Sequence, residues 1–226
     1  MNMIHLDKVT KQYHTRHGNV KALDKVDLTI TDGEFVVVRG PSGSGKTTLL
    51  LSIGGMLRPT EGRIRANGND IYAMRKRDRT KFRSENIGFV FQMFHLIPYL
   101  NILENVLLPS SVVRNRSRVS EAIELLERLN LSERKHHKPS ELSAGEKQRT
   151  AIARAILNHP KIVLADEPTG NLDPVNSDEI FGYLSDFHHT GGTVIVVTHE
   201  MKVNEYADRV ICLKKGRIEE SLGKNK

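Results

Sequence analysis

The chain has 226 residues, of which 38% are hydrophobic and 27% charged, and its formal net charge at pH 7 is +7. This length favours one domain with insertions, and the composition is that of a folded globular chain, not a disordered one. Its apolar runs are far shorter than the roughly 18 residues of a membrane-spanning helix, and the N-terminus has no signal-peptide core. The single cysteine, Cys212, excludes an intrachain disulfide and fits a reducing compartment. We therefore expect the chain to reside in the cytoplasm.

The N-terminal part of the chain has the pattern of half-buried strands. Residues 1–34 and 62–72 alternate polar and apolar side chains around turn signals such as Asn67-Gly68. Such alternation is typical of strands that bury one face. We predict a small antiparallel sheet from these two segments.

Three apolar, β-branched runs instead predict strands that are buried on both faces, as in a parallel sheet. They are Phe35–Val38, Ile162–Ala165 and Thr193–Thr198. Each run is followed by distinctive chemistry, namely Gly40, the acids Asp166 and Glu167, and His199. Because ligands of open α/β sheets bind beyond the carboxyl ends of the strands, we expect these residues to share one site.

Residues 40–48 read GPSGSGKTT, which matches the phosphate-binding P-loop pattern in full. The loop follows a predicted strand and precedes an apolar helix that begins near Leu49. Its backbone N–H groups would face phosphates, Lys46 would reach the terminal phosphates, and the Thr47 hydroxyl would coordinate Mg²⁺. The expected nucleotide-binding residues of the loop are Gly40, Pro41, Ser42, Gly43, Ser44, Gly45, Lys46, Thr47 and Thr48.

The basic residues gather in two stretches, Arg75–Arg83 and Arg114–Arg118. Proteins that bind single-stranded nucleic acid combine such charge with aromatic side chains on which bases stack, and few aromatics lie in these stretches. We interpret them chiefly as solvated helix faces, with a surface for a membrane or a partner as the alternative. We expect no nucleic-acid binding.

The segment 92–157 has few strand signals and several helical ones. In Ser120–Leu129, for example, Ile123, Leu126 and Leu129 recur at helical spacing. We predict an inserted α-helical subdomain at 92–157, with residues 1–91 and 158–226 forming the core and the antiparallel sheet of a single domain. The predicted fold class is α/β: a P-loop NTPase with a mostly parallel core sheet, an N-terminal antiparallel β subdomain and this helical insertion.

Two carboxylates follow the second buried run. Asp166 stands where the Walker-B pattern has the acid that holds Mg²⁺, and Glu167 could polarise an attacking water, which suits hydrolysis. The alternative for these acids is a helix-capping or surface role. An isolated histidine such as His199 is usually packed or at the surface, but its place at a strand end favours function.

Ser143 and Glu146 form the pattern of a capping box at a helix start. A helix N-terminus approached by small residues is also an anion site. Since the P-loop already accounts for the phosphates of its own nucleotide, this second site would take a phosphate held by a neighbouring molecule.

Together, these motifs resemble those of the ATP-binding subunits of ABC transporters, and the resemblance spans residues 13–199. It implies two subunits packed head to tail with two ATP molecules between them. In that arrangement Tyr13 would stack on adenine, Gln92 would sense Mg²⁺ and the attacking water, Glu167 would be the catalytic base, and His199 would contact the γ-phosphate.

The resemblance also implies which residues act across the dimer. Ser143 and Gly145 would reach the partner's γ-phosphate, and Asn171–Asp173 would form the D-loop between subunits. The catalytic set would then be Glu167, His199, Gln92 and Lys46, and the Mg²⁺ set Thr47, Gln92 and Asp166.

The signature segment departs from the family's usual LSGGQ at Ala144 and Glu146. Glu146, ADEPTGNLD at 165–173 and FQMFHLIPYLNILENVLLP at 91–109 resemble the subgroup that drives lipoprotein release and macrolide export. This implies a homodimer on ATP binding that powers a separate membrane permease from the cytoplasmic face of the cell membrane. A helix of the permease would enter a groove formed by Phe94, Leu96, Ile97 and Tyr99, for which plain core packing is the alternative.

Two other classes fit less well. A soluble ABC ATPase that acts on nucleic acid or ribosomes usually carries a long coiled coil or two cassettes in one chain, and neither is present in this sequence. A P-loop kinase would leave the signature segment unexplained.

Overall fold

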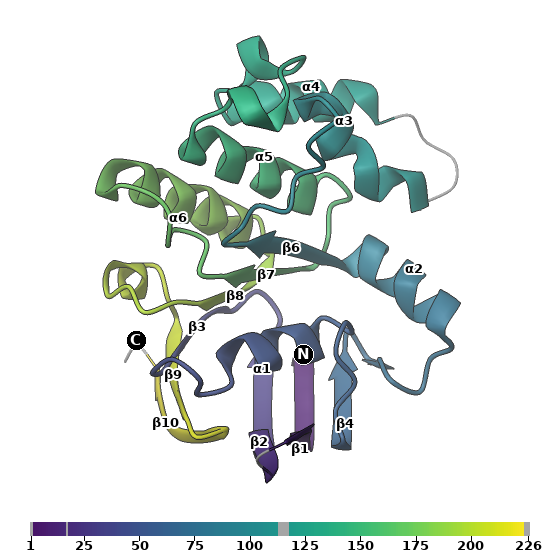
Figure 1. Ribbon diagram of the computed structural model, residues 1–226, viewed down its shortest axis with the longest axis vertical. Coiled ribbons are helices and arrows are strands. Elements are labelled where there is room, and N and C mark those ends of the chain that lie inside the picture. Colours follow the sequence, from purple (N-terminus) through teal and green to yellow (C-terminus); the bar gives the residue numbers. More distant parts are fainter. Residues whose placement is uncertain (1, 17, 113–117, 224–226) are drawn as a thin grey trace.

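The six-stranded sheet at the centre of the molecule is almost entirely parallel (Figure 1). The computed structural model describes residues 2–16, 18–112 and 118–223. The strand order is β10-β9-β3-β8-β7-β6, and only β10 runs antiparallel to its neighbour. The strands are β3 (Phe35–Arg39), β6 (Ile87–Phe91), β7 (Ile162–Asp166), β8 (Thr193–Val197), β9 (Arg209–Lys214) and β10 (Arg217–Gly223). The three predicted buried strands are therefore confirmed as β3, β7 and β8.

Alternate residues of these strands face two separate hydrophobic cores. On β3, Val36 and Val38 pack into the core on one face, whereas Phe35 and Val37 pack into the core on the other. All four side chains are fully buried. This explains why the run is continuously apolar instead of alternating.

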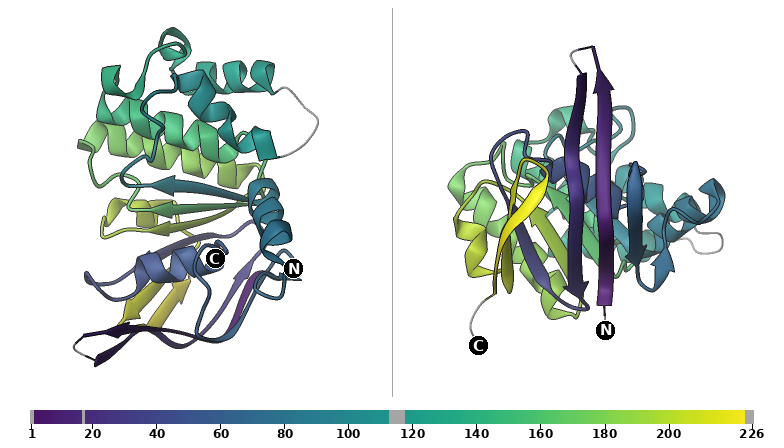
Figure 2. Two further views of the ribbon diagram at one scale, coloured as in Figure 1. Left: turned by 45° about the vertical axis from the view of Figure 1, so that its right-hand side comes forward. Right: turned by 90° about the horizontal axis from the view of Figure 1, so that it is seen from below.

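The first core lies between the large sheet and a four-stranded antiparallel sheet of order β2-β1-β4-β5. Its strands are β1 (Asn2–Thr15), β2 (Gly18–Thr31), β4 (Glu61–Ala66) and β5 (Asn69–Asp70). Ile4 and Leu6 face this core while His5 and Asp7 are exposed, so the predicted antiparallel sheet is confirmed. Helix α1 (Lys46–Ile53) lies between the two sheets, and the β1–β2 hairpin projects beyond the rest of the molecule (Figure 2).

The second core is covered by helices. These are α3 (Ile102–Leu107), α4 (Val119–Arg128), α5 (Ala144–Ile156) and α6 (Pro174–His189), with short 3₁₀ helices at Leu108–Val112, Ser132–Arg134, Pro139–Glu141 and Lys202–Glu205. Because α3, α4 and α5 all come from the segment between β6 and β7, the predicted fold class with its helical insertion is confirmed. The boundaries at 92 and 157 stay a prediction. Within the described ranges, no helix combines the length and apolarity that crossing a bilayer requires.

The buried face of α4 differs from the predicted one in part. Leu126 and Leu129 are buried as expected, but Ile123 is 39% exposed and Ala122 takes the inward position. The buried face therefore consists of residues 122, 126 and 129, which are spaced by four and three residues as on one face of a helix. It differs from the predicted face only in its first residue.

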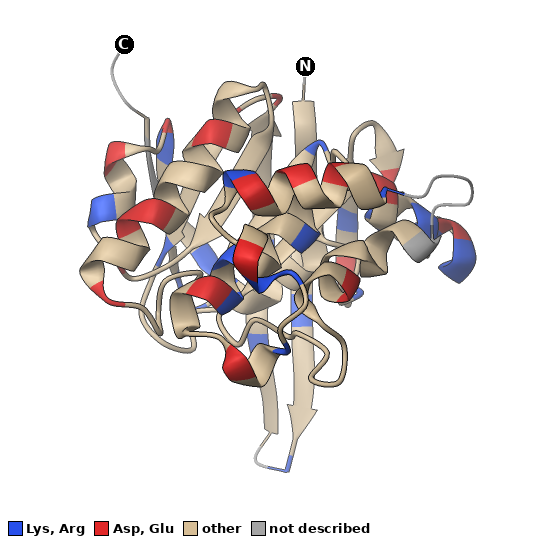
Figure 3. Cartoon of the chain, turned by 90° about the horizontal axis from the view of Figure 1, so that it is seen from above, with Lys and Arg blue, Asp and Glu red and all other residues tan. Residues whose placement is uncertain are grey.

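The first basic stretch forms helix α2 (Lys76–Asn86) and is only partly a solvated face. Arg83 donates to the Gly55 carbonyl at 3.1 Å, and the Arg79 guanidinium lies 5.5 Å from the Tyr72 ring centroid. These two arginines attach α2 to the body of the protein. Residues 114–117 of the second stretch lie outside the described residues. On the helices seen in Figure 3, basic and acidic residues are interspersed.

We expect Gly88→Ala to destabilise the protein, because α5 packs directly on β6. A Cβ atom at Gly88 would lie 2.4 Å from the Ala155 carbonyl oxygen, so the backbones must move apart. Overpacking of this kind costs about 1–3 kcal/mol, or roughly 2–12 °C in Tm for a chain of this size.

Gly182→Ala is the matched control for that substitution. This glycine lies within α6 and a Cβ there meets nothing within 4 Å. Alanine should raise stability by about 0.5–1 kcal/mol, since it lowers the entropy lost on helix formation. Equal Tm changes for the two variants in thermal denaturation would contradict the close packing of α5 on β6.

Candidate functional site

A cavity of about 620 Å³ opens at the carboxyl ends of β3, β6, β7 and β8. We call it the glycine-loop cavity. It is lined by Ala22, Gly40, Pro41, Ser42, Gly43, Ser44, Gly45, Lys46, Thr47, Thr48, Gln92, Glu167 and His199. The structure thus brings together the whole predicted P-loop with three of the residues that follow other strands, as expected for an open α/β sheet.

The P-loop requires glycine at two positions because other backbone segments approach it closely. A Cβ atom at Gly40 would lie 2.0 Å from the Leu213 carbonyl oxygen. Gly45 has φ of 105°, and a Cβ there would lie 2.1 Å from the Ala22 carbonyl oxygen. The loop is therefore fixed by the strands around it before α1 begins at Lys46.

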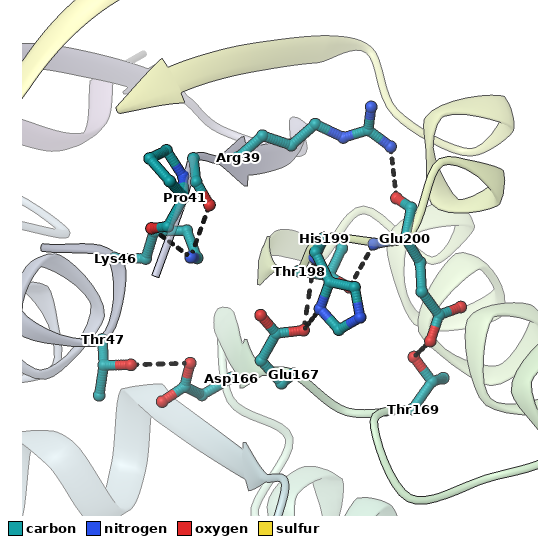
Figure 4. Close-up of polar contacts among 11 residues, drawn as sticks. Arg39, Pro41, Lys46, Thr47, Asp166, Glu167, Thr169, Thr198, His199 and Glu200 are labelled. Atoms are coloured by element: carbon teal, nitrogen blue, oxygen red, sulfur yellow. Dashed lines mark hydrogen bonds and ion pairs between the residues drawn. The ribbon is translucent and has the colours of Figure 1, made fainter. Parts of the chain in front are cut away.

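The Lys46 ammonium lies over the loop itself (Figure 4). Its Nζ donates to the Gly40 carbonyl at 2.8 Å and to the Pro41 carbonyl at 3.2 Å. The Lys46 ammonium and the N-terminus of α1 both favour negative charge at this loop.

Thr47, which lines the cavity, is hydrogen bonded to Asp166, which does not. The Thr47 hydroxyl donates to Asp166 Oδ1 at 3.2 Å, which joins α1 to the end of β7. Burial raises the pKa of the Asp166 carboxyl above its ordinary value, and the nearby Glu167 carboxylate adds to that rise. The Thr47 hydrogen bond and the Lys46 charge act in the opposite direction. A partly buried carboxylate beside a hydroxyl is a donor pair of the oxygen type that Mg²⁺ prefers.

Glu167 and His199 form a pair on the other side of the cavity (Figure 4). Glu167 Oε2 lies 2.9 Å from His199 Nδ1, and the Glu167 side chain is 19% exposed while that of His199 is 72% exposed. Glu167 has φ of 46°, a conformation that non-glycine residues rarely adopt. Its backbone N–H donates to the Val197 carbonyl, so the end of β8 helps to hold it there. Strained backbone of this kind concentrates at functional sites.

Gln92 reaches the cavity from the end of β6. Its backbone carbonyl accepts a hydrogen bond from Asn171 Nδ2 at 3.0 Å. A Cβ atom on Gly170 would lie 2.7 Å from Gln92 Nε2. The segment that follows Glu167 therefore packs directly against Gln92.

Four predicted binding residues do not line the cavity: Asp166, which is bonded to Thr47, and Tyr13, Ser143 and Gly145. Tyr13 pairs with Val20 on the β1–β2 hairpin and is 39% exposed. Ser143 and Gly145 stand at the N-terminus of α5, where the predicted capping box is confirmed by the Glu146 N–H bond to Ser143 Oγ at 3.2 Å.

Sequence reasoning did not identify some residues of the site. Ala22 lines the cavity through the β1–β2 hairpin, and an alanine offers no chemical signal in the sequence. Glu200 Oε1 accepts a hydrogen bond from Thr169 Oγ1 at 2.5 Å, which links the residues after β8 to those after β7. The adjacency of Glu200 to His199 was the signal that could have revealed it.

The raised pKa of Asp166 predicts a cost in stability at neutral pH. When the folded-state pKa lies above the unfolded one, the ionised carboxylate destabilises the fold as pH rises through that interval. Asp166→Asn keeps an acceptor for Thr47 without the charge, so without nucleotide or divalent cation it should melt above the wild type at pH 7.

This advantage of Asp166→Asn should shrink as the pH approaches about 4, where the unfolded carboxyl becomes protonated. Thermal denaturation in EDTA across this range measures it, with Asp186→Asn on the exposed face of α6 as control. A Tm for Asp166→Asn at or below that of the wild type at pH 7 would contradict the account.

The sequence pattern of the ABC transporter family matches residues 23–170. The chain is 44% identical over 217 residues to the macrolide export ATP-binding/permease protein MacB of Chlorobaculum tepidum, a match that covers 96% of this chain but 33% of MacB. It is 42% identical over 219 residues to the lipoprotein-releasing system ATP-binding protein LolD of Bacteroides fragilis, covering 96% of this chain and 100% of LolD.

A solved structure has the same fold. The dimeric post-hydrolysis state of the ATP-binding cassette MJ0796, bound to ADP and Pi, superposes with a TM-score of 0.91 at 40% identity and covers 99% of this chain and 100% of that one. MJ0796 is a protein of Methanocaldococcus jannaschii. With the P-loop, Glu167 and His199 in one cavity, Asp166 bonded to Thr47 of that loop, and the family pattern over most of its length, the chain belongs to the ABC transporter family as an ATP-binding cassette.

Proposed function

We propose that the chain binds ATP with Mg²⁺ and hydrolyses it to ADP and phosphate, as the motor subunit of a transporter that exports or extracts a cargo from the membrane. One observation carries this proposal. The glycine-loop cavity holds a phosphate-binding loop, whose Thr47 forms with Asp166 an oxygen pair suited to a divalent cation, and a Glu–His pair. A simple nucleotide-binding protein has no need of the last of these.

The binding roles follow from the contacts of each residue. Gly40–Thr48 would surround the phosphates, and Lys46 would exchange the Gly40 and Pro41 carbonyls for phosphate oxygens. Thr47 and Asp166 would hold Mg²⁺, with Gln92 as a further ligand. The bound ion supplies neutralisation of phosphate charge. Tyr13, which lies near the tip of the projecting hairpin, would stack on adenine.

Glu167 would act as the general base. Its carboxylate faces the cavity and can accept a proton from a water that attacks the γ-phosphate, while the leaving group is ADP. His199 orients this carboxylate through the 2.9 Å contact and would itself reach the γ-phosphate. The left-handed backbone at Glu167 fixes the side chain in this position.

A second copy of the chain would complete the site. Ser143 and Gly145 do not line the cavity of their own chain, although they stand at a helix N-terminus that favours anions. In a head-to-tail homodimer they would meet the partner's γ-phosphate, with Asn171–Asp173 between the two subunits. The similarity to a dimeric cassette bound to ADP and Pi supports this arrangement.

A membrane permease would bind at a second hollow, of about 380 Å³, beside the end of β6. We call it the β6 hollow. It is lined by Met56, Thr80, Arg83, Ser84, Ile87, Gly88, Phe89, Phe91, His95, Pro109, Arg154, Ala155 and Asn158. This differs from the groove expected from the sequence, because Phe94, Leu96, Ile97 and Tyr99 are not among its lining residues.

The similarity to LolD and to the cassette part of MacB supports lipoprotein release or macrolide export as the type of transport. The permease would be a separate polypeptide, in line with the similarity to LolD, the ATP-binding protein of a lipoprotein-releasing system. The chain would then act at the cytoplasmic face of the cell membrane, held there by its partner.

Glu167→Gln should abolish hydrolysis and leave ATP binding intact. The amide keeps the size of the carboxylate and its contact with His199 but cannot take a proton, so turnover should fall by about 10²- to 10⁴-fold. Steady-state phosphate release measures turnover, and equilibrium binding of a fluorescent ATP analogue measures affinity.

Glu124→Gln, on the exposed face of α4, is the matched control and should behave as the wild type. Lys46→Ala should instead weaken ATP binding itself, because it removes the positive charge that would contact the phosphates. Turnover of Glu167→Gln within a factor of about three of the wild type would exclude the general-base role.

A further inference from the structure

The chain makes a tight turn directly after Gln92. The Phe94 N–H donates to the Phe91 carbonyl at 3.1 Å, which closes the turn at the end of β6. Phe94 has φ of 57° and His95 has φ of 48°. Two consecutive non-glycine residues in the left-handed region persist only where surrounding contacts hold them.

Arg154 supplies those contacts from helix α5. Its Nη2 donates to the Phe94 carbonyl and its Nη1 to the His95 carbonyl, both at 2.6 Å. The planar guanidinium therefore binds both left-handed residues at once, a geometry that a lysine could not reproduce. On the other side of the turn, Asn171 holds the Gln92 carbonyl. The turn is thus fixed between α5 and the segment after Glu167.

The same turn separates the two cavities of the proposed motor. Gln92 lines the glycine-loop cavity, whereas its neighbour Phe91 lines the β6 hollow. The Phe89 and Phe91 rings are stacked with centroids 5.3 Å apart, and the His95 ring meets Phe91 edge-on at 5.0 Å. Arg154 forms part of the wall of the same hollow. A molecule that enters the hollow therefore contacts Arg154 and both ends of the turn.

We propose that Arg154 is a positioning residue: by holding the Phe94 and His95 carbonyls against α5, it fixes the turn that places Gln92 at the nucleotide. The proposal rests on the function proposed above. Arg154 does not itself reach the nucleotide, since it lies outside the glycine-loop cavity.

Arg154→Met tests this positioning role, because it keeps the apolar stem of the side chain and removes both hydrogen-bond donors. With Gln92 displaced, kcat should fall by about 10- to 100-fold, the loss expected from a misplacement of about 1 Å. The KM for ATP should change less than about twofold, since the P-loop is untouched. The Mg²⁺ concentration for half-maximal rate should rise. Arg154→Lys, which can bind only one carbonyl at a time, should recover part of kcat.

Arg118→Met is the matched control. Arg118 also donates to a backbone carbonyl at the end of α5, that of Leu157 at 2.8 Å, but it lines neither the glycine-loop cavity nor the β6 hollow. It should lower Tm in the same way without changing kcat or the Mg²⁺ dependence. Thermal denaturation of both variants establishes that each is folded.

A direct readout uses the single cysteine of the chain. In a Cys212→Ser background, Met93→Cys places a nitroxide label within the turn, at a side chain that is 68% exposed. Electron paramagnetic resonance should show a more mobile label with Arg154→Met and no change with Arg118→Met.

Each outcome decides one of the two proposals. Identical label mobility and identical kcat for Arg154→Met and Arg118→Met would overturn the positioning role. If the wild type does not hydrolyse ATP, the proposed function fails, and the label mobility alone decides whether Arg154 holds the turn.

Discussion

Parallel pairing of four strands in register is the constraint on which the site depends. Asp166 at the end of β7 lies opposite Val197 of β8 on one side and opposite Phe91 of β6 on the other. Val38 of β3 lies opposite Val197 in turn. The residues that follow these four strands therefore emerge at one level, where the P-loop, Gln92, Glu167 and His199 meet. The register is fixed because a slip by one residue would turn every buried side chain of a strand to the opposite core.

Helix α5 connects this site to its surroundings in both directions. Its N-terminus carries the capped Ser143, which is directed to a second copy in the proposed dimer. In its middle, Arg149 pairs with Glu179 of α6 at 3.0 Å, and near its C-terminus Arg154 holds the turn after Gln92. Helix α5 therefore joins the proposed dimer interface to the turn that carries Gln92.

Much of this could be predicted from the sequence because local patterns carried it. The buried strands were visible as apolar runs, the P-loop as a motif between strand and helix, and the cap of α5 as Ser143 with Glu146. What could not be predicted depends on contacts between distant segments. The inward turn of Arg83 to the Gly55 carbonyl and the place of Ala22 in the cavity arise only when sheet and hairpin are packed together.

The β6 hollow gives the same lesson for Arg154. No local pattern marks this arginine, because the two carbonyls it binds are 59 and 60 residues away in the chain. The groove expected from Phe94, Leu96, Ile97 and Tyr99 stays a prediction, since those four residues do not line the β6 hollow and their neighbour His95 does.

The central claim is that one chain carries half of a composite site, and the molar mass of Glu167→Gln in the presence of ATP and Mg²⁺ tests it most directly. By light scattering, the account predicts a chain of 25.5 kDa without nucleotide, twice that mass with ATP, and reversal to the single chain when Ser143→Arg is added. A mass that stays at 25.5 kDa under saturating ATP, or a dimer that Ser143→Arg does not disturb, would contradict it.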